Sequence, residues 1–193
     1  MQPLETAGLE RSLYQASLTI GEEEASGALS LTYVNNGLET LYALYFHLYP
    51  NTQGADSLVI QSVSLNGTAA YHTYTEDGTI LCVPLLNELH RGDAARIYLE
   101  FTVQVPAGGY GAPSAQDGET PLWGLMPSAA LYENGWVLEA APEDVRFGPV
   151  ADWRVDITSQ RTPALASGTV EPLSEGRWLC SLTAATPGLY LLP

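Results

Sequence analysis

The chain contains no lysine, and all 7 of its basic residues are arginines. They are opposed by 22 acidic residues, so the formal net charge is −15 at pH 7. A surface with this charge repels nucleic-acid phosphates and anionic lipid headgroups, so we expect no nucleic-acid partner and no peripheral membrane role. No apolar run approaches the roughly 20 residues that a membrane-spanning helix needs, so we also expect no membrane insertion by this chain.

Cysteine is scarce as well. Cys82 and Cys180 permit one disulfide without requiring it, and a buried free thiol is the commoner outcome in strand-like segments. The first residues, MQPLETAGLERSLYQ, lack the basic region and the apolar stretch of a secretory signal. Either the protein stays inside the cell or a leader has been removed, so the compartment stays open.

Helical periodicity is nearly absent, and apolar residues alternate with polar ones between turns spaced about ten residues apart. Residues 14–20 and 29–33 alternate on either side of an acidic turn, which predicts the start of a hairpin meander. Further strands are predicted at 57–65, 71–75, 79–85, 95–105, 129–132, 136–139, 153–158 and 178–183. Residues 107–121 are rich in Gly, Ala, Pro and Ser, which predicts a long exposed loop. We therefore predict one all-β domain over residues 1–193, a mostly antiparallel β-sandwich.

The least polar stretch is LYALYFHLYPNT, residues 41–52. It is too short for a typical helix and rich in Tyr, Phe and Leu, so we predict a central strand over residues 41–49. Alternate side chains of a strand point to opposite faces. One face, which we expect in the core, would carry Tyr42, Leu44, Phe46 and Leu48; the other would carry Ala43, Tyr45, His47 and Tyr49.

The second face is too apolar for an ordinary solvent-facing surface, yet its Tyr and His tips suit a semi-polar boundary. Three covers are open: the opposing sheet, a loop from the glycine-rich region, or a partner domain. Cover by the chain itself is the simpler of these readings. On the partner-domain reading, Tyr45, His47 and Tyr49 form a domain-docking face.

No arrangement of residues predicts catalysis or metal binding. His47, His72 and His90 lie in different segments, and the chain has no H-E-x-x-H motif. His72 and Glu76 in HTYTE are more simply a surface pair beside a turn. No G-x-S-x-G motif surrounds Ser114, and Cys82 lies mid-strand, where a thiolate is disfavoured. We expect no catalytic, cofactor-binding or metal-binding residue in this chain and no enzymatic activity of its own.

Other short motifs have simple structural explanations. GGYG at residues 108–111 precedes no helix that could hold a phosphate. RGD at residues 91–93 sits where a turn leads into a strand, a place where Gly and Asp are common. We expect Asp152 and Asp156 to be solvated or to form salt bridges.

Several segments, taken in order, carry a family resemblance. They are YFHLYPNT, VSLNGTAAYHTYTEDGTILCVPL, HRGDAARIYLEFTVQVP, GLMPSAALYENGWVLE, DWRVDIT and ASGTV. Over about residues 14–170 this succession resembles the amino-terminal domain of aminopeptidase N-like zinc metallopeptidases. The resemblance implies a saddle-shaped β-sandwich that leans on a separate catalytic domain.

In that family the catalytic domain carries H-E-x-x-H and G-x-M-E-N, and neither motif occurs here. The resemblance therefore implies a non-catalytic auxiliary domain that helps to shape the substrate cleft, with zinc only in the catalytic domain. Its partner would be the catalytic domain of the same parent chain, or a second copy of itself. We expect the chain to be a fragment of a longer peptidase-like protein or a lone relative of the non-catalytic domain. The alternative is a free-standing β-sandwich module that binds a glycan or a protein through residues 108–121 and Trp123.

Overall fold

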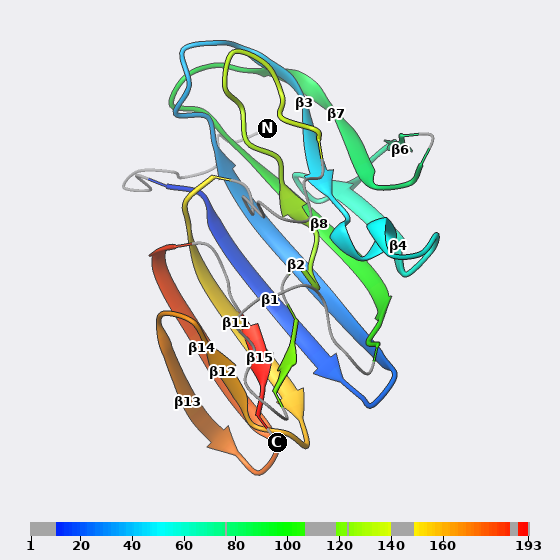
Figure 1. The fold of residues 1–193 in the computed structure, drawn as a ribbon. Coiled ribbons are helices and arrows are strands. Elements are labelled where there is room, and N and C mark those ends of the chain that lie inside the picture. Colours follow the sequence, from blue (N-terminus) through cyan, green and yellow to red (C-terminus); the bar gives the residue numbers. More distant parts are fainter. Residues whose placement is uncertain are drawn as a thin grey trace.

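A computed structural model describes residues 11–75, 77–106, 119–122, 124–139, 149–185 and 189–192. These residues form three β-sheets and one short 3-10 helix (Figure 1). The predicted all-β, mostly antiparallel sandwich is confirmed. Among the described residues, no helix has the length and apolar character required to cross a membrane.

The largest sheet has eight strands in the order β13-β14-β11-β1-β2-β8-β4-β5. Their bounds are β1 (Leu13–Ile20), β2 (Glu24–Val34), β4 (Leu58–Leu65), β5 (Thr68–Ala69), β8 (Ala94–Gln104), β11 (Ala151–Ser159), β13 (Thr169–Ser174) and β14 (Arg177–Ala185). All neighbours in this sheet pair antiparallel except β1 and β11, which run parallel. The sheet forms because its strands alternate: in β1 every second residue from Tyr14 to Ile20 is buried.

Two smaller sheets complete the fold. The four-stranded sheet has the order β10-β3-β7-β6, with β3 (Leu41–His47), β6 (Thr73–Tyr74), β7 (Ile80–Leu89) and β10 (Ser128–Ala129). The three-stranded sheet has the order β12-β15-β9, with β9 (Thr120–Pro121), β12 (Pro163–Leu165) and β15 (Leu189–Leu191). In Figure 1 the β3–β7 pair crosses the upper part of the large sheet, and β15 crosses its lower part.

The buried face of β1 contacts both small sheets. The Tyr14 hydroxyl accepts a hydrogen bond from the backbone N–H of Ala129 in β10, at 2.9 Å. Ile20, on the same face of β1, lines a cleft together with Thr120 of β9 and Leu191 of β15. Both small sheets therefore pack on one side of the large sheet, and the apolar core lies between them.

Gly27 shows how tightly the middle of the large sheet is packed. A Cβ atom at Gly27 would lie 2.6 Å from Cδ2 of Leu18 and 2.7 Å from Cζ of Phe101. Leu18 and Phe101 are the residues that pair with Gly27 from the two neighbouring strands. Glycine at this position lets both large side chains fill the core.

The structure corrects three expectations about the strands. The meander ends after β2, because the second neighbour of β2 is β8 and the chain passes to the other sheet at β3. β3 ends at His47, because the 3-10 helix η1 (Tyr49–Thr52) begins directly after it and has Pro50 at its start. The strand predicted at 136–139 is absent, and only an isolated bridge joins Trp136 to Tyr132.

The core prediction for the least polar stretch is confirmed for Leu44, Phe46 and Leu48, which are fully buried, and is wrong for Tyr42. The Tyr42 side chain is 63% exposed. The register between β3 and β7 shifts between Leu41 and Ala43, so strict alternation fails at this bulge. Leu41, rather than Tyr42, is buried on the core side of the bulge.

Candidate domain-docking site

The predicted docking face is the side of β3 that points away from the core. Phe46 and Leu81 pair across β3 and β7 on the core side, whereas Tyr45 and Cys82 pair on the outer side. A hydrogen bond with the Cys82 side chain, more than the partial burial of the ring, raises the pKa of Tyr45. The outer face of β3 is thus a half-buried aromatic strip and holds no ionised group at neutral pH.

A short hairpin lies over this strip. We call residues 131–137 the cover hairpin: the Val137 N–H donates to the Leu131 carbonyl at 2.8 Å, and Tyr132 and Trp136 form the bridge. Its turn is made by Asn134 and Gly135, both at positive φ, which these two residue types tolerate. The segment is joined to β3 just before the hairpin, where the Ala130 N–H donates to the Tyr45 carbonyl at 2.7 Å.

Aromatic contacts hold the cover hairpin against β3. The Trp136 ring lies 5.4 Å from the Tyr45 ring, and Tyr132 meets Trp136 edge-on at 5.2 Å. Tyr33 of β2 approaches Trp136 from another side, at 6.4 Å between ring centroids. Trp136 is thus the centre of an aromatic cluster drawn from three separate segments.

His47 joins the far end of the cover hairpin to β3 by a hydrogen bond. Its side chain is 3% exposed, and its Nε2 atom lies 3.0 Å from the Val137 carbonyl. A carbonyl only accepts, so Nε2 carries the proton, while the buried Nδ1 has no hydrogen-bond partner among the described residues. Burial lowers the pKa of His47, and the bond to Val137 opposes this shift in part. His47 is therefore neutral at pH 7.

Tyr49 stacks on the His47 ring, with 5.0 Å between ring centroids and an interplanar angle of 14°. Burial raises the pKa of Tyr49 to about 12, so this ring is neutral as well. The chain's own residues thus enclose His47, while Tyr45 and Tyr49 keep partial exposure. Docking of another domain at Tyr45, His47 and Tyr49 stays a prediction.

The three histidines do not come together. His72 lies edge-on to Tyr74 at 5.6 Å, and Glu76, its predicted partner, lies outside the described residues. His90 is exposed and contacts Thr40 and Glu88. Within the part of the chain that the structure describes, no group of three or more His, Cys, Asp or Glu side chains could hold a metal ion.

Both cysteines are free thiols. Cys82 is partly buried, and Cys180 is fully buried in the core. Burial raises the pKa of Cys180 to about 11, so its thiol stays protonated and unreactive at neutral pH.

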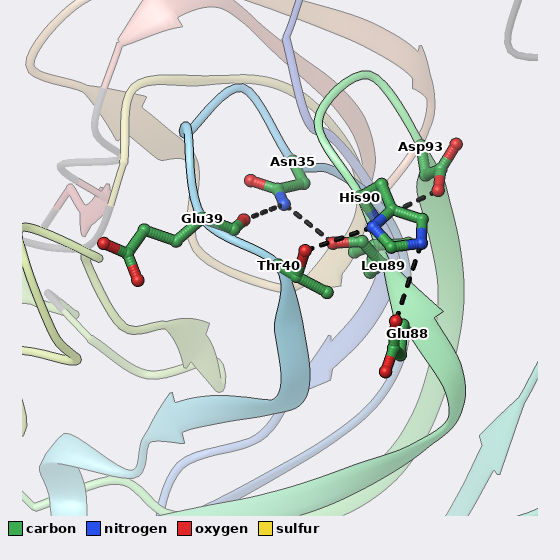
Figure 2. A network of polar contacts seen from close by, with 7 residues as sticks. All are labelled: Asn35, Glu39, Thr40, Glu88, Leu89, His90 and Asp93. Atoms are coloured by element: carbon green, nitrogen blue, oxygen red, sulfur yellow. Dashed lines mark hydrogen bonds and ion pairs between the residues drawn. The ribbon is translucent and has the colours of Figure 1, made fainter.

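A polar network ties together the turns at the upper end of the sandwich (Figure 2). Asn35 is 2% exposed, and its Nδ2 donates to the carbonyls of Leu89 at 2.9 Å and Glu39 at 2.8 Å. Its Oδ1 accepts from the Gly37 N–H at 3.0 Å. One buried amide therefore joins the end of β2, the approach to β3 and the end of β7.

The RGD segment is part of the same region and is a turn, as expected. Gly92 has φ +84°, and the Asp93 carboxylate accepts from the His90 N–H at 2.9 Å.

Asp152 forms the expected ion pair, with Arg11 at 3.3 Å. Ser114, residues 108–111 and Trp123 lie outside the described residues.

A cleft of about 490 Å³ lies at the other end of the sandwich, lined by residues that include Ile20, Val105 and Arg161. The Arg161 guanidinium donates to the carbonyls of Leu191 at 2.9 Å and Leu192 at 2.8 Å, and to the Thr120 hydroxyl at 2.7 Å. Arg161 thus attaches β15 and β9 to the loop before β12. The sequence gives no sign of this role, because the acceptors at Leu191 and Leu192 are backbone carbonyls.

No family model and no curated protein matches the sequence. Solved structures do match it in fold. An M1 zinc metallopeptidase from Deinococcus radiodurans aligns with a TM-score of 0.59 at 19% identity, over 94% of this chain and 41% of its own. The chain has the fold of one part of an M1 zinc metallopeptidase.

Two further structures agree. A variant of a two-domain M1 zinc metallopeptidase, bound to L-tryptophan, aligns with a TM-score of 0.57 at 18% identity, over 94% of this chain and 42% of its own. A variant from Deinococcus radiodurans bound to a Tyr-Ser-Ala substrate gives a TM-score of 0.56 at 18% identity, over 94% and 41%. The chain thus spans about two-fifths of the M1 metallopeptidases it matches.

Proposed function

We propose that this chain is the amino-terminal, non-catalytic domain of an aminopeptidase N-like zinc metallopeptidase. In that role it packs on a catalytic domain of the same parent chain and helps to shape the substrate cleft. The observation that carries this proposal is the match of 94% of the chain to only 41% of an M1 metallopeptidase. The family resemblance of the ordered segments supports the same assignment.

The division of labour follows from the chemistry. Peptide hydrolysis by a metallopeptidase needs a metal-activated water and a carboxylate base. The sequence has no H-E-x-x-H motif to supply them, so zinc and the catalytic residues belong to the catalytic domain. In this role the chain forms one wall of the substrate cleft. The predicted docking face at Tyr45, His47 and Tyr49 supports the cover hairpin, and the hairpin packs on the catalytic domain.

The test uses the complete reading frame that contains this sequence. We expect it to encode H-E-x-x-H downstream, and we expect its product to release amino acids from aminoacyl fluorophores. Deleting residues 1–193 should lower kcat/KM and change the preference among aminoacyl groups, and adding this chain back should restore part of the loss. A variant without the Glu of H-E-x-x-H is the control for contaminating peptidases. A reading frame without that motif would overturn the proposal.

A further inference from the structure

Charge is distributed unevenly between the sheets. Glu88, at the end of β7, is the sole charged residue in the strands β3, β6, β7 and β10, all of which are described. The large sheet, by contrast, carries charges on its strands, among them Glu100, Arg154 and Asp156, which are exposed or half-exposed. In a chain with a net charge of −15, a sheet face that is open to water is expected to carry charged side chains. A sheet that is almost without charge therefore indicates contact with another surface.

The face of this nearly uncharged sheet is also partly uncovered. Tyr42 is 63% exposed and Leu86 is 72% exposed. Pro84, two residues before Leu86, pairs with Ala43 on the outer side and is exposed too. Tyr42 and Leu86 both lie within the bulge between β3 and β7. The cover hairpin, which packs on Tyr45 of the same strand as Tyr42, adds Val137, which is 39% exposed.

Resting on the proposed function, we infer that Tyr42, Pro84 and Leu86, with the outer side of the cover hairpin, form the surface on which the catalytic domain packs. Tyr45 and His47 lie beneath the cover hairpin and position it, and Tyr42 and Leu86 contact the partner directly. The M1 metallopeptidases of this fold have more than half of their own chain outside the matched part. A parent chain of similar length would contain a domain large enough to cover this surface.

The rim of this surface indicates the chemistry of the partner. Glu39, Glu88 and Glu133 are exposed around it, and the Tyr132 hydroxyl holds Glu39 beside the cover hairpin at 3.3 Å. A second copy docked here through a two-fold axis would bring two acidic rims together, which is unfavourable. The complementary partner surface is apolar at its centre and carries Arg or Lys at its edge.

The test compares two pairs of substitutions in the full-length product. Tyr42→Asp with Leu86→Asp places charge on the proposed surface. Val59→Asp with Leu173→Asp places the same charge on exposed apolar residues of β4 and β13 in the large sheet, which are 43% and 50% exposed. Thermal unfolding of the 1–193 chain alone should be the same for the first pair and the unsubstituted chain, because neither side chain is buried.

In the full-length product, the first pair should split one unfolding transition into two and should speed hydrogen exchange in β3 and β7. It should also lower kcat/KM at least about tenfold, while the control pair leaves all three measurements unchanged. Glu88→Lys should weaken the binding of the 1–193 chain to the remainder of the full-length product. This effect should be smaller at high salt than at low salt, because salt screens the charge.

The outcomes separate the two proposals. If the reading frame encodes H-E-x-x-H but the first pair behaves like the control pair, the inferred surface is wrong and the proposed function stands. If the frame lacks H-E-x-x-H, the proposed function fails and the inference fails with it. If the full-length product dimerises and the first pair abolishes the dimer, the occupant is a second copy and the inference is overturned.

Discussion

The Nε2 atom of His47 donates to the carbonyl oxygen of Val137, 3.0 Å away and 90 residues further along the chain. This bond joins the end of β3 to the end of the cover hairpin. It is made by a neutral imidazole that is almost fully buried, with its second nitrogen unpartnered among the described residues. Protonation would place a second N–H in that enclosed space.

The first prediction is a loss of stability at mildly acidic pH that depends on His47. Burial lowers the His47 pKa from its ordinary value of 6.5, so the unfolded chain binds this proton at a higher pH than the folded chain. The stabilising effect of the neutral ring is fully present above 6.5 and is lost as the pH falls below it. Urea unfolding between about pH 7.5 and about pH 5.5 measures the decline.

The matched variant is His47→Gln, whose amide can still donate to Val137 but does not titrate. The difference in free energy of unfolding between the wild-type chain and this variant should shrink as the pH falls, because only the wild-type chain has a ring at position 47 that can bind a proton. His90→Gln is the control, since this substitution leaves the bond between His47 and Val137 in place, and the same decline with pH should be measured. A constant difference between wild type and His47→Gln across this range would contradict the prediction.

The second prediction concerns the buried amide at the upper turns. Asn35→Ala removes two donors from the carbonyls of Leu89 and Glu39 and leaves the Leu89 carbonyl buried without that partner. We expect the free energy of unfolding to fall by about 2–3 kcal/mol, as for other buried groups that lose their partner. Asn87→Ala, at an exposed position of β7, should change stability by less than about 0.5 kcal/mol. Denaturant unfolding measures both, and equal effects would count against this role of Asn35.

Asn35 also shows where sequence reasoning stops. Alternation predicted β1, β4, β8, β11 and β14 close to their observed bounds, because the period of a strand is encoded locally. β2 begins at Glu24, inside the segment that was predicted to be an acidic turn. The residues that join the strands are different: Asn35 reaches a carbonyl 54 positions away, and Arg161 reaches one 30 positions away. Backbone carbonyls are the same at every position, so no sequence pattern marks these acceptors.

The sequence predicts the apolar character of the outer face of β3 but not the segment that covers it. Its apolar character at Tyr45, His47 and Tyr49 is visible in the sequence and led to the expectation of a cover. The cover itself depends on Trp136 and Val137, in a segment that alternation assigned to a strand. Tyr42 was placed in the core because strict alternation ignores the bulge, and the bulge arises from β7 rather than from β3 alone.

The third prediction tests the contact between the large sheet and the four-stranded sheet. Tyr14 is 1% exposed, stacks on Trp153 at 3.7 Å and accepts from the Ala129 N–H. Tyr14→Phe keeps the ring and leaves that buried N–H without its acceptor, which should cost about 1–2 kcal/mol in the free energy of unfolding.

Tyr33→Phe is the control for that variant. Tyr33 is also buried, at 6% exposure, but its hydroxyl forms no hydrogen bond with another described residue. We expect a change below about 0.5 kcal/mol. The result would argue against this contact if both variants lost the same stability.

The last prediction is that the chain, purified without added metal, contains no stoichiometric zinc and releases no amino acid from peptides or aminoacyl substrates. Zinc sites need clustered Cys, His or carboxylate ligands, and His47, His72 and His90 lie apart, with His47 neutral but enclosed by the cover hairpin. Elemental analysis and a fluorogenic assay measure the two quantities. One zinc per chain that disappears in His47→Ala or His72→Ala would contradict the first half. Turnover that follows the protein through every purification step would contradict the second half, and it would place catalysis in residues assigned here to a non-catalytic domain.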